Sequence, residues 1–132
     1  DLDLGYRTSK LQSTRYILLS AAFSLQSGNK EVISSAMDDL MNRRMTTQPL
    51  DKPSCGSTFK RPAGNFAGKL ISDCGLKGMS VGGAQVSEKH AGFVINTGNA
   101  TAADVIALTD AVRDKVFEKY GVKLELEIKQ LG

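Results

Sequence analysis

The sequence has few of the residues that build metal sites, disulfide frameworks or nucleic-acid surfaces. It holds two cysteines, Cys55 and Cys74, and one histidine, His90, with no spacing typical of a zinc site. We therefore expect both cysteines to be reduced thiols in a cytosolic protein. Tryptophan is absent, and the three tyrosines and five phenylalanines do not cluster as base-stacking residues do. A nucleic-acid partner is therefore not favoured, although the net charge is +3.

Long apolar runs are lacking too. The longest, residues 16–25, is interrupted by two serines and falls short of the roughly 20 residues that span a bilayer, so we expect no membrane association. With 132 residues, 41% of them hydrophobic, the chain is long enough for the core of one domain. It starts without methionine and already alternates like a strand, so we expect it to be a piece of a longer protein.

Positive charge is concentrated in one window, residues 43–69. It holds six of the 17 basic residues and one of the 14 acidic residues, which leaves the rest of the chain with 11 basic and 13 acidic residues. Excess charge beside glycines and hydroxyl groups suits a phosphate or another small anion, because backbone N–H groups can converge there. The alternative is a solvated basic loop without a ligand.

The hydrophobic pattern predicts an α+β fold, in which a small mixed sheet packs with helices from about residue 28 onward. Strands are predicted at residues 2–6, 15–25, 91–96 and 122–129, of which the first two belong outside this domain. Helices are predicted at residues 30–44, 65–74 and 101–120, and a glycine-rich shaped loop at 75–90. Thr101 and Asp104 have the spacing of a near capping box, and Gly121 ends the last helix.

Three residues are candidates for chemistry. Ser57 follows a glycine in the basic window and can be a nucleophile, a proton donor or a turn residue. His90 could serve as its base, but the flanking residues are not those of a nucleophile elbow, which argues against a hydrolase triad. Glu127 on the last strand and Arg7 near the start could both be ordinary exposed charges. The residues alone therefore predict an α+β domain with an anion-binding loop.

Several motifs nevertheless occur together and in order along the chain. They are Tyr6-Arg7-x-Ser9, Arg43-Arg44 with Gln48-Pro49-Leu50, residues 53–62 (PSCGSTFKRP), residues 66–71 (FAGKLI), Gly75-Leu76-Lys77-Gly78, Gly82-Gly83-Ala84, residues 87–93 (SEKHAGF) and residues 124–132 (LELEIKQLG). In this combination the chain resembles the C-terminal part of the UDP-N-acetylenolpyruvoylglucosamine reductase (MurB) family, in its shorter form. The resemblance extends over the whole sequence.

The resemblance implies a flavoenzyme of bacterial peptidoglycan biosynthesis. Such enzymes use NADPH and a bound FAD to reduce the enolpyruvyl ether of a UDP sugar to UDP-N-acetylmuramate in the cytoplasm. It also implies that residues 1–27 are C-terminal strands of the FAD-binding domain and that residues 28–132 are the substrate-binding domain. The FAD-binding region lies N-terminal to these residues in the family, so we expect this fragment alone to bind no FAD and to be inactive.

The same resemblance implies roles for individual residues. Ser57 matches the proton donor, while Glu127 and Arg7 match the acid and the arginine that bind the substrate carboxylate. Residues at substrate-binding positions are Arg44, Gln48, Lys60, Arg61, Lys77, His90 and Lys129.

The chain departs from the family pattern at Thr8, Thr47, Arg61 and Lys129, where the family commonly has an acid, a lysine, an asparagine and an arginine. A lysine at 129 cannot reproduce the two-pronged contact of an arginine. The alternative function is a non-catalytic module that binds a UDP sugar or another anion when isolated.

Overall fold

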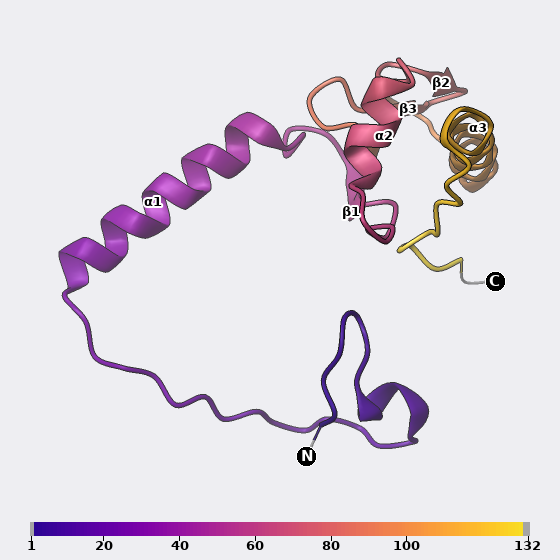
Figure 1. Cartoon of the computed structure of the whole chain (residues 1–132). Helices are drawn as coiled ribbons and strands as arrows, with labels where there is room; N and C mark the ends of the chain where they lie inside the picture. The colour runs from indigo at the N-terminus through magenta and orange to yellow at the C-terminus, as the bar shows by residue number, and fades with distance from the viewer. Residues whose placement is uncertain (1, 131–132) are drawn as a thin grey trace. The chain divides into compact units, whose positions relative to one another are not determined.

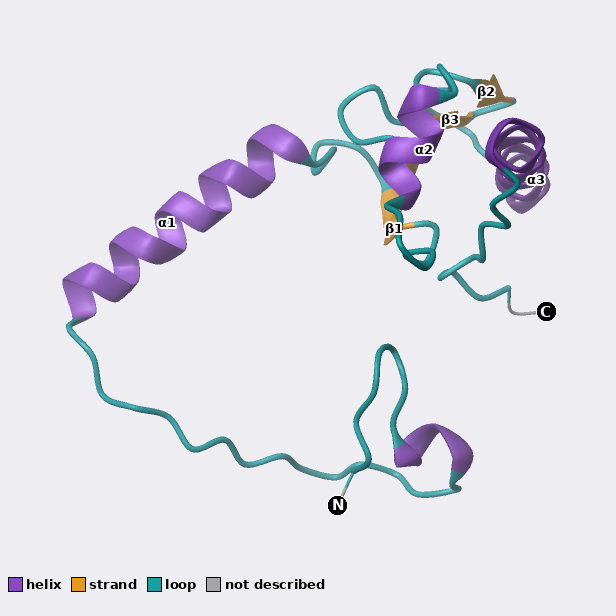
Figure 2. Cartoon of the chain, viewed as in Figure 1, coloured by secondary structure: helices purple, strands orange, loops and turns teal. Residues whose placement is uncertain are grey.

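The computed structural model describes residues 2–130. The chain divides into two compact units, of which the first ends at Ile33 and the second begins at Ser34. The elements are the short 3-10 helix η1 (Lys10–Ser13), α1 (Lys30–Thr47), β1 (Ser54–Ser57), α2 (Ala67–Asp73), β2 (Ser80–Val81), β3 (Ala84–Val86), β4 (Phe93–Asn96) and α3 (Ala102–Tyr120) (Figure 1). The sheet and the helices α2 and α3 all belong to the second unit, which has the predicted α+β character (Figure 2).

The four strands form one sheet in the order β1-β4-β3-β2. Every pairing is antiparallel, so the sheet is not the mixed one expected from the sequence. The strand predicted at residues 91–96 is β4, and its residues Phe93, Val94 and Ile95 are buried as a central strand requires. Ser57 of β1 lies opposite Phe93 of β4, with an irregularity in the pairing between Ser54 and Ser57.

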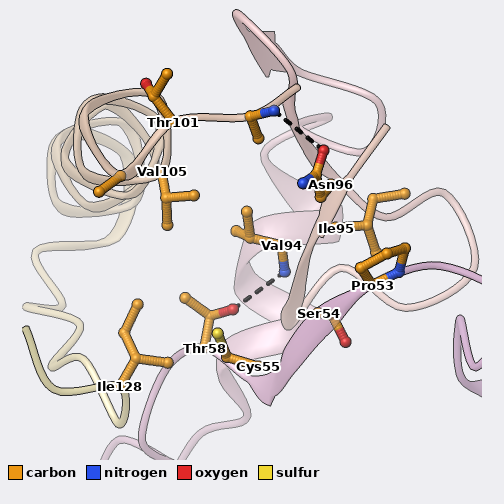
Figure 3. A pocket seen from close by; sticks show the side chains of 12 residues that line it. Pro53, Ser54, Cys55, Thr58, Val94, Ile95, Asn96, Thr101, Val105 and Ile128 are labelled. Atoms are coloured by element: carbon orange, nitrogen blue, oxygen red, sulfur yellow. Dashed lines mark hydrogen bonds between the residues drawn. The ribbon is translucent and has the colours of Figure 1, made fainter. Parts of the chain in front are cut away.

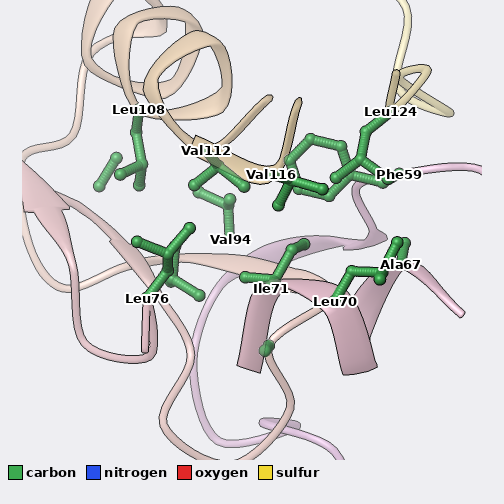
Figure 4. Close-up of a cluster of buried hydrophobic side chains, with 13 residues drawn as sticks. Phe59, Ala67, Leu70, Ile71, Leu76, Val94, Leu108, Val112, Val116 and Leu124 are labelled. Carbon is green, nitrogen blue, oxygen red and sulfur yellow. The ribbon is translucent and has the colours of Figure 1, made fainter. Parts of the chain in front are cut away.

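One hydrophobic core joins the sheet to α2 and α3 (Figure 4). Side chains that are at most 2% exposed come from every layer, among them Phe59, Ile71, Val86, Leu108, Val112, Val116 and Leu124. Leu108, Val112 and Val116 recur at four-residue spacing along α3, which places them on the helix face that meets the core. The core therefore sets the position of the segments that follow β1 and α3.

Local signals set both ends of α3, as predicted. The Thr101 side chain accepts a hydrogen bond from the Asp104 backbone N–H at 3.1 Å, and the Asp104 carboxylate accepts one from the Thr101 N–H at 2.9 Å. The hydrogen bond from the Thr101 backbone N–H to the carboxylate, followed by one from the Thr101 side chain, lowers the pKa of Asp104 from its ordinary value of 3.8. Gly121 ends the helix in a left-handed conformation with φ of 66°.

The segment after α3 is not the regular strand that the sequence predicts. Residues 122–129 keep the expected alternation, with Leu124 buried and its neighbours Lys123 and Glu125 exposed. Within residues 2–130, their pairing is limited to one isolated bridge, between Leu126 and Phe59. Phe59 lies two residues beyond the end of β1, where the chain is no longer paired as a strand. The segment around Phe59 and residues 122–129 therefore pair over only a few residues.

The two strands predicted at residues 2–6 and 15–25 are not formed. The first contains a turn closed by backbone hydrogen bonds between Gly5 and Thr8, and the second has no regular structure. A strand gains its hydrogen bonds from a neighbouring strand, and among residues 2–130 none is paired with either segment. These predictions are therefore wrong for the chain in this structure.

Helix α1 confirms the predicted helix and extends it by three residues, from position 44 to 47. It buries none of its residues, although an apolar stripe runs along it. The exposed members of this stripe include Val32, Ile33, Met37, Leu40, Met41 and Met45. Pro49, two residues beyond the helix, is buried and starts the basic loop.

Candidate functional site

Thr58 is the residue on which the candidate site is built. It is 1% exposed, and each of its polar groups has a partner. Its N–H donates to the Gly92 carbonyl at 2.8 Å, and its side-chain oxygen accepts from the Val94 N–H at 3.0 Å. Its carbonyl accepts from the Glu127 N–H at 2.9 Å. Thr58 thus joins β4 and the C-terminal segment directly beside Ser57.

Ser57 ends β1 and is exposed. The preceding Gly56 has φ of 80°, a conformation that other residues rarely adopt, so the backbone turns sharply just before the serine. The Ser57 hydroxyl donates to the Phe59 carbonyl at 3.2 Å. A hydroxyl held by one long hydrogen bond at an accessible strand end can reorient toward a bound molecule. This geometry agrees with a role in proton transfer and does not require one.

Glu127 is brought to the same place by the C-terminal segment. Its backbone N–H is bonded to Thr58, the neighbour of Ser57, and the residue is half-buried. Ser57 and Glu127 lie 70 positions apart in the sequence, and the hydrogen bond from the Glu127 N–H to the residue that follows Ser57 brings their backbones close together. Of the predicted site residues, Ser57 and Glu127 are thus two that the fold brings to the same place from distant parts of the sequence.

Arg7 lies in the other unit, in the turn between Gly5 and Thr8. Its φ is 58°, its carbonyl accepts from the Gln12 side chain at 3.1 Å, and its guanidinium carbon lies 6.0 Å from the centre of the Tyr6 ring. Its part in a common site with Ser57 is therefore a proposal and not an observed contact.

The predicted basic side chains of the loop are each held by a neighbour. Lys60 forms an ion pair with Glu125 at 3.0 Å, and its backbone N–H donates to the Glu125 carbonyl. The Arg61 guanidinium lies 3.9 Å above the centre of the Phe66 ring, a cation–π contact. Both partners of the Lys60 pair are well exposed, so the pair orients Lys60 more than it stabilises the fold.

Arg44 and Gln48 are neighbours at the end of α1. The Arg44 Nε donates to the Gln48 side-chain oxygen at 3.1 Å. The Lys89 ammonium donates to the Met45 carbonyl at 2.8 Å, which ties the last turn of α1 to the segment that carries His90. Two of the predicted substrate-binding segments are thereby brought together by a contact that the sequence did not predict.

Lys77 and Lys129 are exposed on loops, and the structure gives neither a side-chain partner among the described residues. His90 is half-buried beside Phe93, with the two rings edge to face at 5.0 Å between centroids.

The Lys69 ammonium is paired with Asp73 one helical turn along α2, and the hydrogen bond with Asp73 raises the pKa of Lys69.

A largely apolar cavity of about 320 Å³ lies between β1, β4 and the start of α3 (Figure 3). Its lining comprises Pro53, Ser54, Cys55, Thr58, Val94, Ile95, Asn96, Ala100, Thr101, Ala102, Val105 and Ile128. None of the predicted site residues lines it. No motif in the sequence indicated this cavity, because its lining comes from four separate segments. Cys55 and Cys74 are both free thiols.

Among residues 2–130, no three His, Cys, Asp or Glu side chains gather as they would around a metal ion. No helix within the same range is long and apolar enough to cross a membrane.

These features define a small α+β domain in which a serine at a strand end and a glutamate from the C-terminal segment are joined at one buried threonine. The model of the family described as "UDP-N-acetylenolpyruvoylglucosamine reductase, C-terminal domain" matches residues 48–131. The chain therefore belongs to this family, as the sequence motifs predicted.

Individual relatives agree with this assignment. The UDP-N-acetylenolpyruvoylglucosamine reductase of Geobacillus thermodenitrificans is 58% identical over 132 residues, and that of Exiguobacterium sibiricum is 54% identical. Both matches cover the whole chain but only 43% of the relative. The crystal structure of the Thermus caldophilus enzyme (MurB) superposes with a TM-score of 0.80 at 38% identity, over 97% of this chain and 45% of that one. The chain thus spans less than half the length of these relatives.

Proposed function

We propose that the chain is the substrate-binding and proton-donating part of a reductase that converts UDP-N-acetylglucosamine enolpyruvate to UDP-N-acetylmuramate, in peptidoglycan biosynthesis in the bacterial cytoplasm. The observation that carries the proposal is the joining of Ser57 and Glu127 through Thr58. Membership of the family supports it, because the relatives are named for this reduction. Residues 28–132 would form the substrate domain, and residues 1–27 would belong to the flavin-binding part.

We propose that this chain by itself binds no FAD, and the geometry of its glycine-rich loop supports this. The glycines at 75, 78, 82 and 83 form turns around β2 and β3, and none of them belongs to a phosphate-binding loop between a strand and a helix. FAD, reduced by NADPH, would supply the hydride from the part of the reductase that lies outside these residues. This chain would contribute the proton donor and the residues that bind the substrate.

Proton donation by Ser57 is chemically reasonable for this reduction. When a hydride adds to one carbon of the enolpyruvyl double bond, negative charge develops on the neighbouring carbon and its carboxylate. A serine hydroxyl is a very weak acid and can protonate only a strong base, which such a carbanion is. Glu127, beside Ser57, and Arg7, from the first unit, would stabilise the carboxylate as this charge develops.

The remaining predicted residues would bind the sugar nucleotide. Lys60 and Arg61 follow Ser57 on the same loop, and their side chains are oriented by Glu125 and Phe66. Arg44, Gln48, Lys77, His90 and Lys129 would complete the contacts with the diphosphate and the sugar. Three of the five, Arg44, Lys77 and Lys129, are exposed cations, which suit an anion more than an apolar ligand.

The test is Ser57→Ala in the complete reductase, with Ser54→Ala as the control. Ser54 lies on the same strand, and its hydroxyl accepts only a long contact of 3.4 Å from the Gly56 N–H. We expect Ser57→Ala to leave flavin reduction by NADPH unchanged and to abolish product formation, because the carbanion then has no proton donor. Stopped-flow absorbance of the flavin separates the two half-reactions. Normal product formation by Ser57→Ala would remove Ser57 from the mechanism.

A second candidate is a non-catalytic module that binds a UDP sugar when isolated from the flavin-binding part. The preformed orientation of Lys60 and Arg61 within this chain favours it. Titration of the chain with the enolpyruvyl UDP sugar, followed by amide chemical shifts, tests it directly. Shifts confined to residues near Ser57, Lys77 and His90 are expected, and unchanged spectra at millimolar ligand would contradict it.

A further inference from the structure

The cavity between β1, β4 and the start of α3 is lined by none of the residues assigned to the UDP sugar (Figure 3). Its volume of about 320 Å³ is within the range of small-molecule sites, toward the lower end. Two of its lining residues, Thr58 and Val94, are at most 7% exposed, whereas Pro53 and Cys55 are exposed. The cavity is therefore closed by the core on one side and open toward β1.

The lining of this cavity carries no charge. Among the described residues that form it, none has an ionisable carboxylate, ammonium or guanidinium group. In the adjoining first turn of α3, the Asp104 carboxylate accepts from the Thr101 N–H at 2.9 Å, so the positive end of the helix is already compensated. A bound ion would lose its hydration without gaining a countercharge from the lining. The cavity therefore suits a neutral molecule.

Asn96 supplies a polar group to this apolar space. Its side-chain oxygen accepts from the backbone N–H groups of Gly98 at 2.8 Å and Ala100 at 3.1 Å, which assigns the other arm of the amide as the NH₂ group. Among residues 2–130 none accepts a hydrogen bond from that nitrogen. Figure 3 shows the nitrogen directed toward Val94 and the oxygen directed away from it. A carbonyl oxygen inside the cavity can therefore accept from Asn96.

The cavity also lies beside the strand end that carries Ser57. Cys55 and Thr58 both line it, and they are the residues two before and one after the serine. Ser57 itself is exposed and does not line it. A molecule in the cavity would therefore contact residues on both sides of Ser57 without contacting its hydroxyl group.

We propose that this cavity is a second binding site, for a small neutral molecule with an apolar body and one carbonyl oxygen that accepts a hydrogen bond from the Asn96 amide. The site is separate from the residues assigned to the UDP sugar, and the inference does not depend on the proposed reaction. Because Cys55 and Thr58 flank Ser57, occupancy of the cavity changes the surroundings of the serine.

Two probes of similar shape test the inference. Acetophenone has a carbonyl group on an apolar ring, and ethylbenzene lacks the hydrogen-bond acceptor. Each probe is titrated into the 132-residue chain, and amide chemical shifts are followed. We expect shifts at residues 55–58, at Asn96 and in the first turn of α3. The two probes differ in hydrophobicity, so the informative quantity is the ratio of their affinities compared between variants.

Substitutions at two lining residues test the contact and the location. Asn96→Asp removes the donor but keeps the acceptor for Gly98 and Ala100. It should bind acetophenone about fivefold more weakly, as the loss of one hydrogen bond predicts, with ethylbenzene unchanged. Val105→Phe should fill the cavity and abolish the binding of both probes. Ile106→Phe, at the exposed neighbour that does not line the cavity, is the matched control and should bind both normally.

The two free cysteines give a measurement that needs no substitution. Cys55 lines the cavity and Cys74 does not. Acetophenone should slow the alkylation of Cys55 by iodoacetamide and leave that of Cys74 unchanged, as measured by mass spectrometry. The same protection is expected in the complete reductase.

Other outcomes would overturn the inference in distinguishable ways. Binding that persists in a folded Val105→Phe chain would place the probes elsewhere, and an unchanged affinity ratio in Asn96→Asp would remove the Asn96 contact. If neither probe binds at millimolar concentration and Cys55 is not protected, the cavity is only a packing defect. Protection that is lost in the complete reductase would mean that the rest of that protein fills the cavity. None of these outcomes affects the Ser57→Ala test of the proposed function.

Discussion

Two neighbouring hydroxyl residues, Ser57 and Thr58, have opposite environments. Ser57 is exposed with one long hydrogen bond, whereas Thr58 is buried and its side-chain oxygen accepts from Val94. The end of β1 explains the difference, because the strand ends at Ser57 and the next two residues, Thr58 and Phe59, are both buried. A residue that can react and a residue that holds it in place can therefore be adjacent in the sequence.

This difference predicts different results for two substitutions at position 58. Thr58→Val keeps the shape of the side chain but leaves the buried Val94 N–H without an acceptor, which should lower the free energy of unfolding by about 1–3 kcal/mol. Thr58→Ser keeps the acceptor and should cost less. Urea unfolding of the 132-residue chain, followed by circular dichroism, measures both. Equal stabilities for the two variants would show that this hydrogen bond contributes little.

At the level of elements, α3 is the best example of a structure set by local signals. Its capping box, its left-handed Gly121 and its buried stripe all act within a few residues. Helix α1 has the same kind of apolar periodicity but buries none of its side chains in this structure. Periodicity thus predicts that a helix forms, and it does not predict what covers its apolar side.

The capping box gives a prediction for stability and its pH dependence. Thr101→Ala should lower the free energy of unfolding by about 1 kcal/mol at neutral pH, because the Asp104 N–H loses its acceptor. The pKa of Asp104 is lowered in the folded chain, so its stabilising effect is present above the ordinary value of 3.8 and is lost as the pH falls through the lowered pKa.

Asp104→Asn should remove that part of the acid sensitivity. Urea midpoints measured between neutral pH and about pH 3 should converge for Asp104→Asn and the unsubstituted chain as the pH falls. Curves that stay parallel over this range would show that Asp104 is not the group responsible.

At the scale of the whole molecule, the two units differ in how much they bury. The second unit contains the hydrophobic core, while the first contains large exposed side chains such as Tyr16, Ile17, Leu19 and Phe23. Exposed apolar surface of this kind promotes association. All the described members of the core come from residues 59–126, and α1 buries none of its residues.

A fragment spanning residues 48–132 should therefore fold by itself. We expect its urea midpoint to match that of the 132-residue chain, because the core is retained and only surface contacts such as the Lys89 bond to Met45 are lost. We also expect the fragment to remain monomeric at concentrations at which the longer chain self-associates. Circular dichroism and sedimentation velocity measure the two properties. A fragment without a cooperative transition would show that residues 1–47 are needed for folding.

The sequence by itself determined the features that local chemistry encodes. Helix α3 follows from Thr101, Asp104 and Gly121, strand β4 follows from its buried apolar run, and membership of the family follows from motifs in order. Only the tertiary structure decided that the Glu127 backbone bonds to Thr58, the neighbour of Ser57, and that Gly68 and Gly92 leave room for the His90 ring. It also decided that residues 2–6 and 15–25 form no strands. The reason is that helix caps are satisfied within a few residues, whereas strand pairing and side-chain slots need partners from distant parts of the chain.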